Sequence, residues 1–142
     1  MNASIAAPSH TPRLSRSELK VLLVDDDSFQ LELISEILRG LGILNITQAS
    51  SGAQALQAMT HKQPSFNLLV MDLHMPGMDG FQFMESVAKD GFSGALIIVS
   101  GQSADVMRAA SLVAQLRRFT LLGAVPKPVG RAALSELISK LA

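Results

Sequence analysis

The fold follows from one short stretch, KVLLVDDD at residues 20–27, where a continuous apolar run stops abruptly at three aspartates. An unbroken apolar run of this length is typical of a parallel strand covered on both faces. Residues 28–39 then place leucine and isoleucine at helical spacing, and Gly40 is a natural stop. Asp27 can cap this helix, with Gln30 three residues later as the reciprocal partner of a capping box. The stretch therefore predicts a strand followed directly by a helix.

The same alternation continues to the end of the chain. Strands alternating with helices imply right-handed crossovers and a parallel sheet with helices on both faces. We predict an α/β fold of the doubly wound, flavodoxin-like kind, with five strands in the order 2-1-3-4-5 and five helices. The further predicted strands are residues 44–48, 66–71, 95–99 and 121–125, and the further predicted helices are residues 52–59, 81–89, 103–118 and 131–141.

Composition limits the classes of function. The 142 residues suit one domain, which we place at residues 19–142 after a flexible leader at residues 1–18. Twelve Lys and Arg balance 12 Asp and Glu, so no overall field favours nucleic acid or an acidic membrane. The absence of cysteine excludes disulfides and thiolate metal sites. No apolar run is long enough to span a bilayer and no signal peptide is visible, so we expect a cytoplasmic protein.

Polar residues collect at the predicted strand ends. Asp25 and Asp26, Asp72, Ser100 and Lys127 each stand at or just after the carboxyl end of a strand. In an open parallel sheet these ends converge where ligands bind. Three carboxylates gathered together raise one another's pKa, and a hard cation such as Mg²⁺ relieves this repulsion. With Lys127 and Ser100 suited to phosphoryl oxygens, the set predicts a phosphoryl-transfer site.

Four motifs in this order resemble the receiver domains of two-component response regulators. They are LVDDD at residues 23–27, MDLHMPGMDG at 71–80, IVSG at 98–101 and KP at 127–128. Each motif alone is weak, but all four fall at a strand end. The resemblance covers residues 20–142 and implies a switch that accepts a phosphoryl group, with slow autodephosphorylation, rather than a dedicated enzyme.

The resemblance also implies residue roles and partners. Asp72 would take the phosphoryl group from a sensor histidine kinase or phosphotransfer protein, and the Lys127–Pro128 bond would be cis. The state would pass to an output domain or partner through the face of the fourth helix, fifth strand and fifth helix, and a homodimer is compatible with it. Mg²⁺ would be bound by Asp25 (directly or through water), Asp26, Asp72 and the backbone carbonyl of His74, while Ser100 and Lys127 would contact the phosphoryl group.

Two features depart from the family. The position three before Lys127 usually holds Tyr or Phe and here is Ala124, so the aromatic rotamer switch is missing. The stretch between Ser100 and Lys127 is longer than usual by about a helical turn, similar to receivers that precede cyclic-di-GMP phosphodiesterase domains. At the rim of the site, the family resemblance suggests that the side chains of His74 and Gln102 set the lifetime of the phosphoryl group.

Two alternatives remain open at this point. A haloacid-dehalogenase-like phosphatase would use Asp25 or Asp27 as its nucleophile, but the later acidic pair and the room for a cap domain are missing. A receiver fold that works without phosphorylation is compatible with Ala124. Phosphorylation of Asp72 would favour the receiver, whereas phosphorylation within residues 25–27 would favour the phosphatase. If the protein did not respond to Mg²⁺ and a phosphodonor, the module that works without phosphorylation would be favoured.

Overall fold

The computed structural model describes residues 14–61, 66–75, 77 and 80–142. It confirms the predicted α/β fold. One parallel sheet of five strands has the order β2-β1-β3-β4-β5. The strands are β1 (Lys20–Val24), β2 (Asn45–Ala49), β3 (Leu68–Asp72), β4 (Ala95–Ser100) and β5 (Thr120–Pro126).

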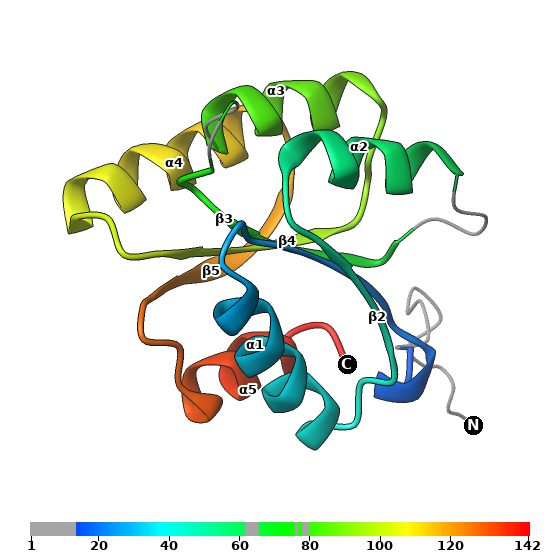
Figure 1. Ribbon diagram of the computed structural model, residues 1–142. Coiled ribbons are helices and arrows are strands. Elements are labelled where there is room, and N and C mark those ends of the chain that lie inside the picture. Colours follow the sequence, from blue (N-terminus) through cyan, green and yellow to red (C-terminus); the bar gives the residue numbers. More distant parts are fainter. Residues whose placement is uncertain (1–13, 62–65, 76, 78–79) are drawn as a thin grey trace, which may run out of the picture.

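Helices cover both faces of this sheet. Figure 1 shows α2, α3 and α4 on one face and α1 and α5 on the other. Each helix follows the strand before it, which gives the doubly wound arrangement of successive crossovers. The helices are α1 (Ser28–Gly40), α2 (Gly52–His61), α3 (Gly80–Lys89), α4 (Ala104–Leu116) and α5 (Arg131–Ile138).

Two apolar layers hold the helices against the sheet. Successive residues of a strand point to opposite faces, so Val21 and Leu23 of β1 enter the layer beneath α1 and α5. Leu22 and Val24 enter the other layer, beneath α2, α3 and α4. All residues of β3 and β4 are buried. β3 and β4 are therefore fixed from both sides by packing.

Several boundaries differ from the sequence prediction. β5 continues to Pro126, and its pairing with β4 shifts register between Leu96 and Ile97. The capping box was predicted wrongly. Asp27 does cap α1, accepting the Phe29 amide at 2.9 Å, but its own amide donates to Asp25 Oδ1 at 2.9 Å. The aspartate at the end of the strand takes the place predicted for Gln30.

Residues 14–18 of the predicted leader lie in the described part of the chain, and residues 1–13 lie outside it. A 3-10 turn, η2, spans Arg16–Glu18. The Arg16 guanidinium donates to the carbonyl of Leu41 after α1 and to that of Ala142 after α5. Among the described residues, no helix combines the length and the apolar character needed to cross a bilayer.

Candidate functional site

The carboxyl ends of four strands bring the predicted site residues to one edge of the sheet. Asp72 and Ser100 are the last residues of β3 and β4, and Asp25 and Lys127 directly follow β1 and β5. Because these strands are parallel neighbours, residues far apart in sequence lie together. The side chains of Asp25, Asp72 and Ser100 are buried, with 1%, 4% and 0% of each residue exposed.

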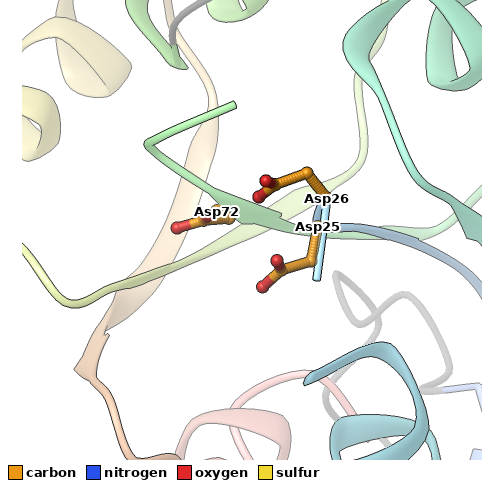
Figure 2. Close-up of side chains that lie close together, drawn as sticks. All are labelled: Asp25, Asp26 and Asp72. Carbon is orange, nitrogen blue, oxygen red and sulfur yellow. The ribbon is translucent and has the colours of Figure 1, made fainter. Parts of the chain in front are cut away.

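Three carboxylates form the centre of the site. One oxygen each from Asp25, Asp26 and Asp72 lies within 4.8 Å of the others. Figure 2 shows all three carboxylates projecting to the same side, two from the end of β1 and one from β3. Asp26 is exposed while Asp25 is buried. The cluster therefore has a buried floor and an open rim.

Lys127 pairs with two of these carboxylates. Its Nζ lies 2.9 Å from Asp25 Oδ2 and 3.5 Å from Asp72 Oδ1. Its backbone is fixed as well, since its amide donates to the Ser100 carbonyl at 2.9 Å. The Lys127–Pro128 peptide bond is cis, as predicted. Because Asp25 Oδ1 accepts the Asp27 amide, both oxygens of Asp25 are engaged.

The electrostatics of Asp72 oppose its charged form. Burial raises the pKa of Asp72, and the nearby charge of Asp25 raises it further. The charge of Lys127, the backbone amide of His74 and a hydrogen bond from Lys127 act in the lowering direction, but the net effect is an upward shift. Lys127 therefore compensates the negative charge of Asp72 only in part.

Lys127 is shifted in the direction that keeps it charged. Burial by itself lowers the pKa of its ammonium, but the hydrogen bond to Asp25 and the charges of Asp72 and Asp25 outweigh burial. The net shift of the Lys127 pKa is upward. A permanent positive charge therefore stands beside Asp72 and Asp25.

A divalent cation fits this arrangement. Three carboxylates and one ammonium sum to −3 + 1 = −2. Oxygen ligands from one or two carboxylates, completed by waters, are the set that Mg²⁺ prefers. The exposed rim at Asp26 leaves room for such waters. The site can thus neutralise a hard cation and present a carboxylate beside it.

Ser100 ends β4, the strand that neighbours β3 in the sheet. Its Oγ accepts the backbone amide of Gln102 at 2.9 Å, which fixes the hydroxyl at the end of β4. The side chains of His74 and Gln102 are exposed at the rim. Ala124 of β5 is paired with Ile98 of β4. It is partly buried and packs against the core layer beneath α4. A methyl group therefore fills the position where the family usually carries an aromatic ring.

Sequence reasoning missed the second function of Asp25. The sequence predicted that Lys127 contacts a phosphoryl oxygen. In the structure, the shorter of the two carboxylate contacts of the Lys127 ammonium is to Asp25. The excess of aspartates over cations in the motifs was the available signal. What the motifs did not reveal is that one oxygen of Asp25 anchors the start of α1 through Asp27, while the other holds Lys127.

Comparison with known proteins agrees with this geometry. The family model of the response regulator receiver domain matches residues 21–139. A probable chemotaxis protein CheY of Rhizobium etli is 40% identical over 99 residues, covering 67% of this chain and 75% of that protein. A receiver domain structure from Clostridium thermocellum has a TM-score of 0.72 and 26% identity, covering 87% of this chain and 93% of the other.

A longer relative matches through one part only. Ethylene receptor 4 of Oryza sativa subsp. indica is 32% identical over an alignment of 144 positions that covers 96% of this chain. The chain spans only 18% of the length of that receptor.

Proposed function

This chain belongs to the response regulator receiver domain family, and from that premise we propose that it is a phosphoryl-accepting switch with Asp72 as its acceptor. The observation that carries the proposal is the position of Lys127, whose ammonium contacts both Asp25 and Asp72 beside the exposed Asp26. If the aspartates served only to cap a helix, no lysine from the end of another strand would be required beside them.

The residues divide the work of phosphoryl transfer. A carboxylate oxygen of Asp72 attacks the phosphorus of a phosphohistidine on a kinase or phosphotransfer protein. The P–N bond breaks, its electron pair stays on the imidazole nitrogen, and that nitrogen takes a proton from solvent. Lys127 neutralises one phosphoryl oxygen and the Ser100 hydroxyl donates to another.

Asp25, Asp26, Asp72 and the His74 carbonyl would hold Mg²⁺. The ion supplies charge neutralisation on the phosphoryl oxygens when it is bound.

The outcome of phosphorylation is a shift between two surface conformations rather than catalysis of a substrate reaction. Ser100 and Lys127 each stand four residues before a helix, α4 and α5 respectively, so a group bound between them acts on the face formed by α4, β5 and α5. We propose that this face relays the state to an output domain or partner, and that the protein works in the cytoplasm. With Ala124 on β5, the relay depends on movement of the loop after Ser100 rather than on a ring.

The test is phosphorylation by a small phosphodonor. Acetyl phosphate with Mg²⁺ is expected to add one phosphoryl group to the intact protein, and peptide mapping is expected to find it on Asp72. Asp72→Asn is the matched variant and should remain unmodified. Label on residues 25–27 would instead support a phosphatase, and no label with or without Mg²⁺ would support a receiver fold that works unphosphorylated.

A further inference from the structure

A cavity lies at the edge of the sheet opposite the aspartate cluster. Its volume is about 390 Å³, which is within the range of small-molecule sites. The last turn of α2, the residue before the start of β3 and the connection from α3 to β4 border it, so it adjoins the amino ends of β3 and β4. The side chains that bear on its chemistry are Met59, Thr60, Phe66, Asp90, Phe92 and Ser93. None of them belongs to the site proposed for phosphorylation.

The apolar wall of this cavity is held in place by the core and by the turn that ends α3. Phe66 is buried, and Met59 packs against the core layer beneath α2 and α3. The ring centroids of Phe92 and Phe119 are 6.2 Å apart. The backbone amide of Phe92 donates to the carbonyl of Val87 at 3.3 Å. The wall therefore exists before any ligand binds, which lowers the entropic cost of binding.

The polar groups at the cavity are mainly acceptors. The Asp90 carboxylate is exposed and makes no hydrogen bond or ion pair with another residue in the described part of the chain. Thr60 Oγ1 already donates to the Leu56 carbonyl at 2.9 Å, so its oxygen can only accept from a ligand. The Ser93 hydroxyl can donate or accept. A positively charged group that donates several hydrogen bonds fits this set.

Two helix ends favour the same sign of charge. α2 ends at His61 and α3 ends at Lys89, and both helices lie on the same face of the sheet (Figure 1). A helix carries partial negative charge at its carboxyl end, where its last carbonyls lie. The face of the Phe92 ring also attracts cations. The Lys89 side chain is exposed and does not line the cavity, so it leaves this preference in place.

We propose that the cavity binds a small organic cation, a primary amine whose aromatic or branched aliphatic body packs against Met59, Phe66 and Phe92. Asp90 supplies the countercharge, and the two hydroxyl oxygens at the cavity are further acceptors for the ammonium. An anion would meet the Asp90 carboxylate and the carboxyl ends of two helices. The charges therefore select the amine among ligands of the same size.

A titration of the full chain with phenethylamine, followed through amide chemical shifts, tests the site. A Kd on the order of 1 mM is expected for a ligand of this size, with shifts at Thr60 and residues 90–93. The neutral analogue 2-phenylethanol is expected to bind about three- to fivefold more weakly, as for the loss of an exposed ion pair. The anion 3-phenylpropionate is expected to bind more weakly still. Equal binding of all three, or amine-induced shifts confined to residues 25–27 and 72, would overturn the proposal.

Two variants separate charge from packing. Asp90→Asn is expected to weaken phenethylamine about three- to fivefold and to leave 2-phenylethanol unchanged, whereas Phe92→Leu weakens both ligands. Asp105→Asn, which removes an exposed carboxylate from α4, is the control and should bind like the unaltered chain. If Asp90→Asn still preferred the amine to the alcohol, the proposal would be wrong. The site is independent of phosphorylation, so Asp72→Asn is expected to bind phenethylamine as strongly as the unaltered chain.

Discussion

At the scale of single residues, Lys127 acts as the cation of the site when no metal is bound. Its ammonium lies 2.9 Å from a carboxylate oxygen of Asp25, a residue that is 1% exposed. Removing one member of a buried pair leaves the other charge without compensation. We therefore expect the stability of the fold and the binding of Mg²⁺ to be linked through this one side chain.

We predict that Lys127→Met lowers the free energy of unfolding of the metal-free protein by about 1–3 kcal/mol. The reason is that Asp25 and Asp72 lose their shared ammonium. Urea denaturation measures the effect, and Lys89→Met, a substitution of an exposed lysine in the last turn of α3, is the control. Millimolar Mg²⁺ is expected to reduce the loss, because the ion compensates the same carboxylates. An equal loss with and without Mg²⁺ would contradict this account.

Asp72 makes stability depend on pH in a stated direction. Burial and the charge of Asp25 raise its pKa in the folded state. A raised pKa means that the folded state holds the proton more tightly than the unfolded state. Protonation of Asp72 therefore stabilises the folded state, and this stabilisation is complete below the ordinary aspartate pKa. The effect is lost as the pH rises through the folded pKa. Above the folded pKa of Asp72, the charged carboxylate therefore destabilises the metal-free protein.

We predict that Asp72→Asn raises the Tm of the metal-free protein at pH 7 by roughly 2–5 °C. The gain is expected to shrink as the pH falls through the folded pKa of Asp72 and to disappear below about 4, where the carboxyl becomes protonated in the unfolded state as well. Thermal denaturation over this pH range measures it. Addition of Mg²⁺ should reverse the order of the two proteins at pH 7. If the increase in Tm were the same at every pH, the effect would come from packing rather than from charge, which would contradict this account.

His74 and Gln102 stand at the rim where water reaches the site. The amide of Gln102 donates to Ser100 Oγ at 2.9 Å, so its side chain begins beside the proposed position of the phosphoryl group. We predict that His74→Ala and Gln102→Ala each change the rate of dephosphorylation at least about threefold, since they alter the path of the attacking water. Loss of label from the phosphorylated protein measures this rate. Gln115→Ala, at the far end of α4, should leave it unchanged.

At the scale of elements, the start of α3 is packed directly on the backbone that follows β3. The Gly80 amide donates to the Leu73 carbonyl at 2.7 Å. A Cβ at residue 80 would lie 2.8 Å from the Cα and the carbonyl oxygen of Leu73. Only glycine allows this approach, which sets the path of the chain through Leu73 and His74.

We predict that Gly80→Ala costs about 1–3 kcal/mol of unfolding free energy and weakens Mg²⁺ binding, because the displaced backbone carries the His74 carbonyl. Gly101→Ala is the control, since a Cβ there meets nothing within 4 Å. Urea denaturation and a metal titration measure the two effects. Equal behaviour of the two variants would show that the close contact at Leu73 does not position the site.

The sequence predicted the elements well where apolar periodicity is strong. β1, β3 and β4 are continuous apolar runs in the sequence and are buried in the fold. Prediction failed where side chains compete for one backbone group. The Asp27 amide had two potential acceptors, Gln30 on the helix and Asp25 on the strand, and only the three-dimensional path of the chain selects Asp25.

At the scale of the whole molecule, the gathering of the site followed from topology alone. Parallel strands in the order β2-β1-β3-β4-β5 place the carboxyl ends of β1, β3, β4 and β5 along one edge. The details within that edge could not be predicted, because strand order does not fix which oxygen a flexible lysine contacts. The exposure of Leu112 and Leu116 on α4 was also not predicted, since helical spacing alone does not show which face the sheet covers.

We propose that Asp25, Asp72, Ser100 and Lys127 act together on a phosphoryl group held beside a divalent cation. Amide chemical shifts recorded with Mg²⁺ and beryllofluoride, a mimic of that group, are the test. We predict that Mg²⁺ alone shifts residues around Asp25 and Asp72, and that both reagents together also shift Ser100 and Lys127. Unchanged shifts at these four residues, or the same changes in Asp72→Ala, would contradict the account.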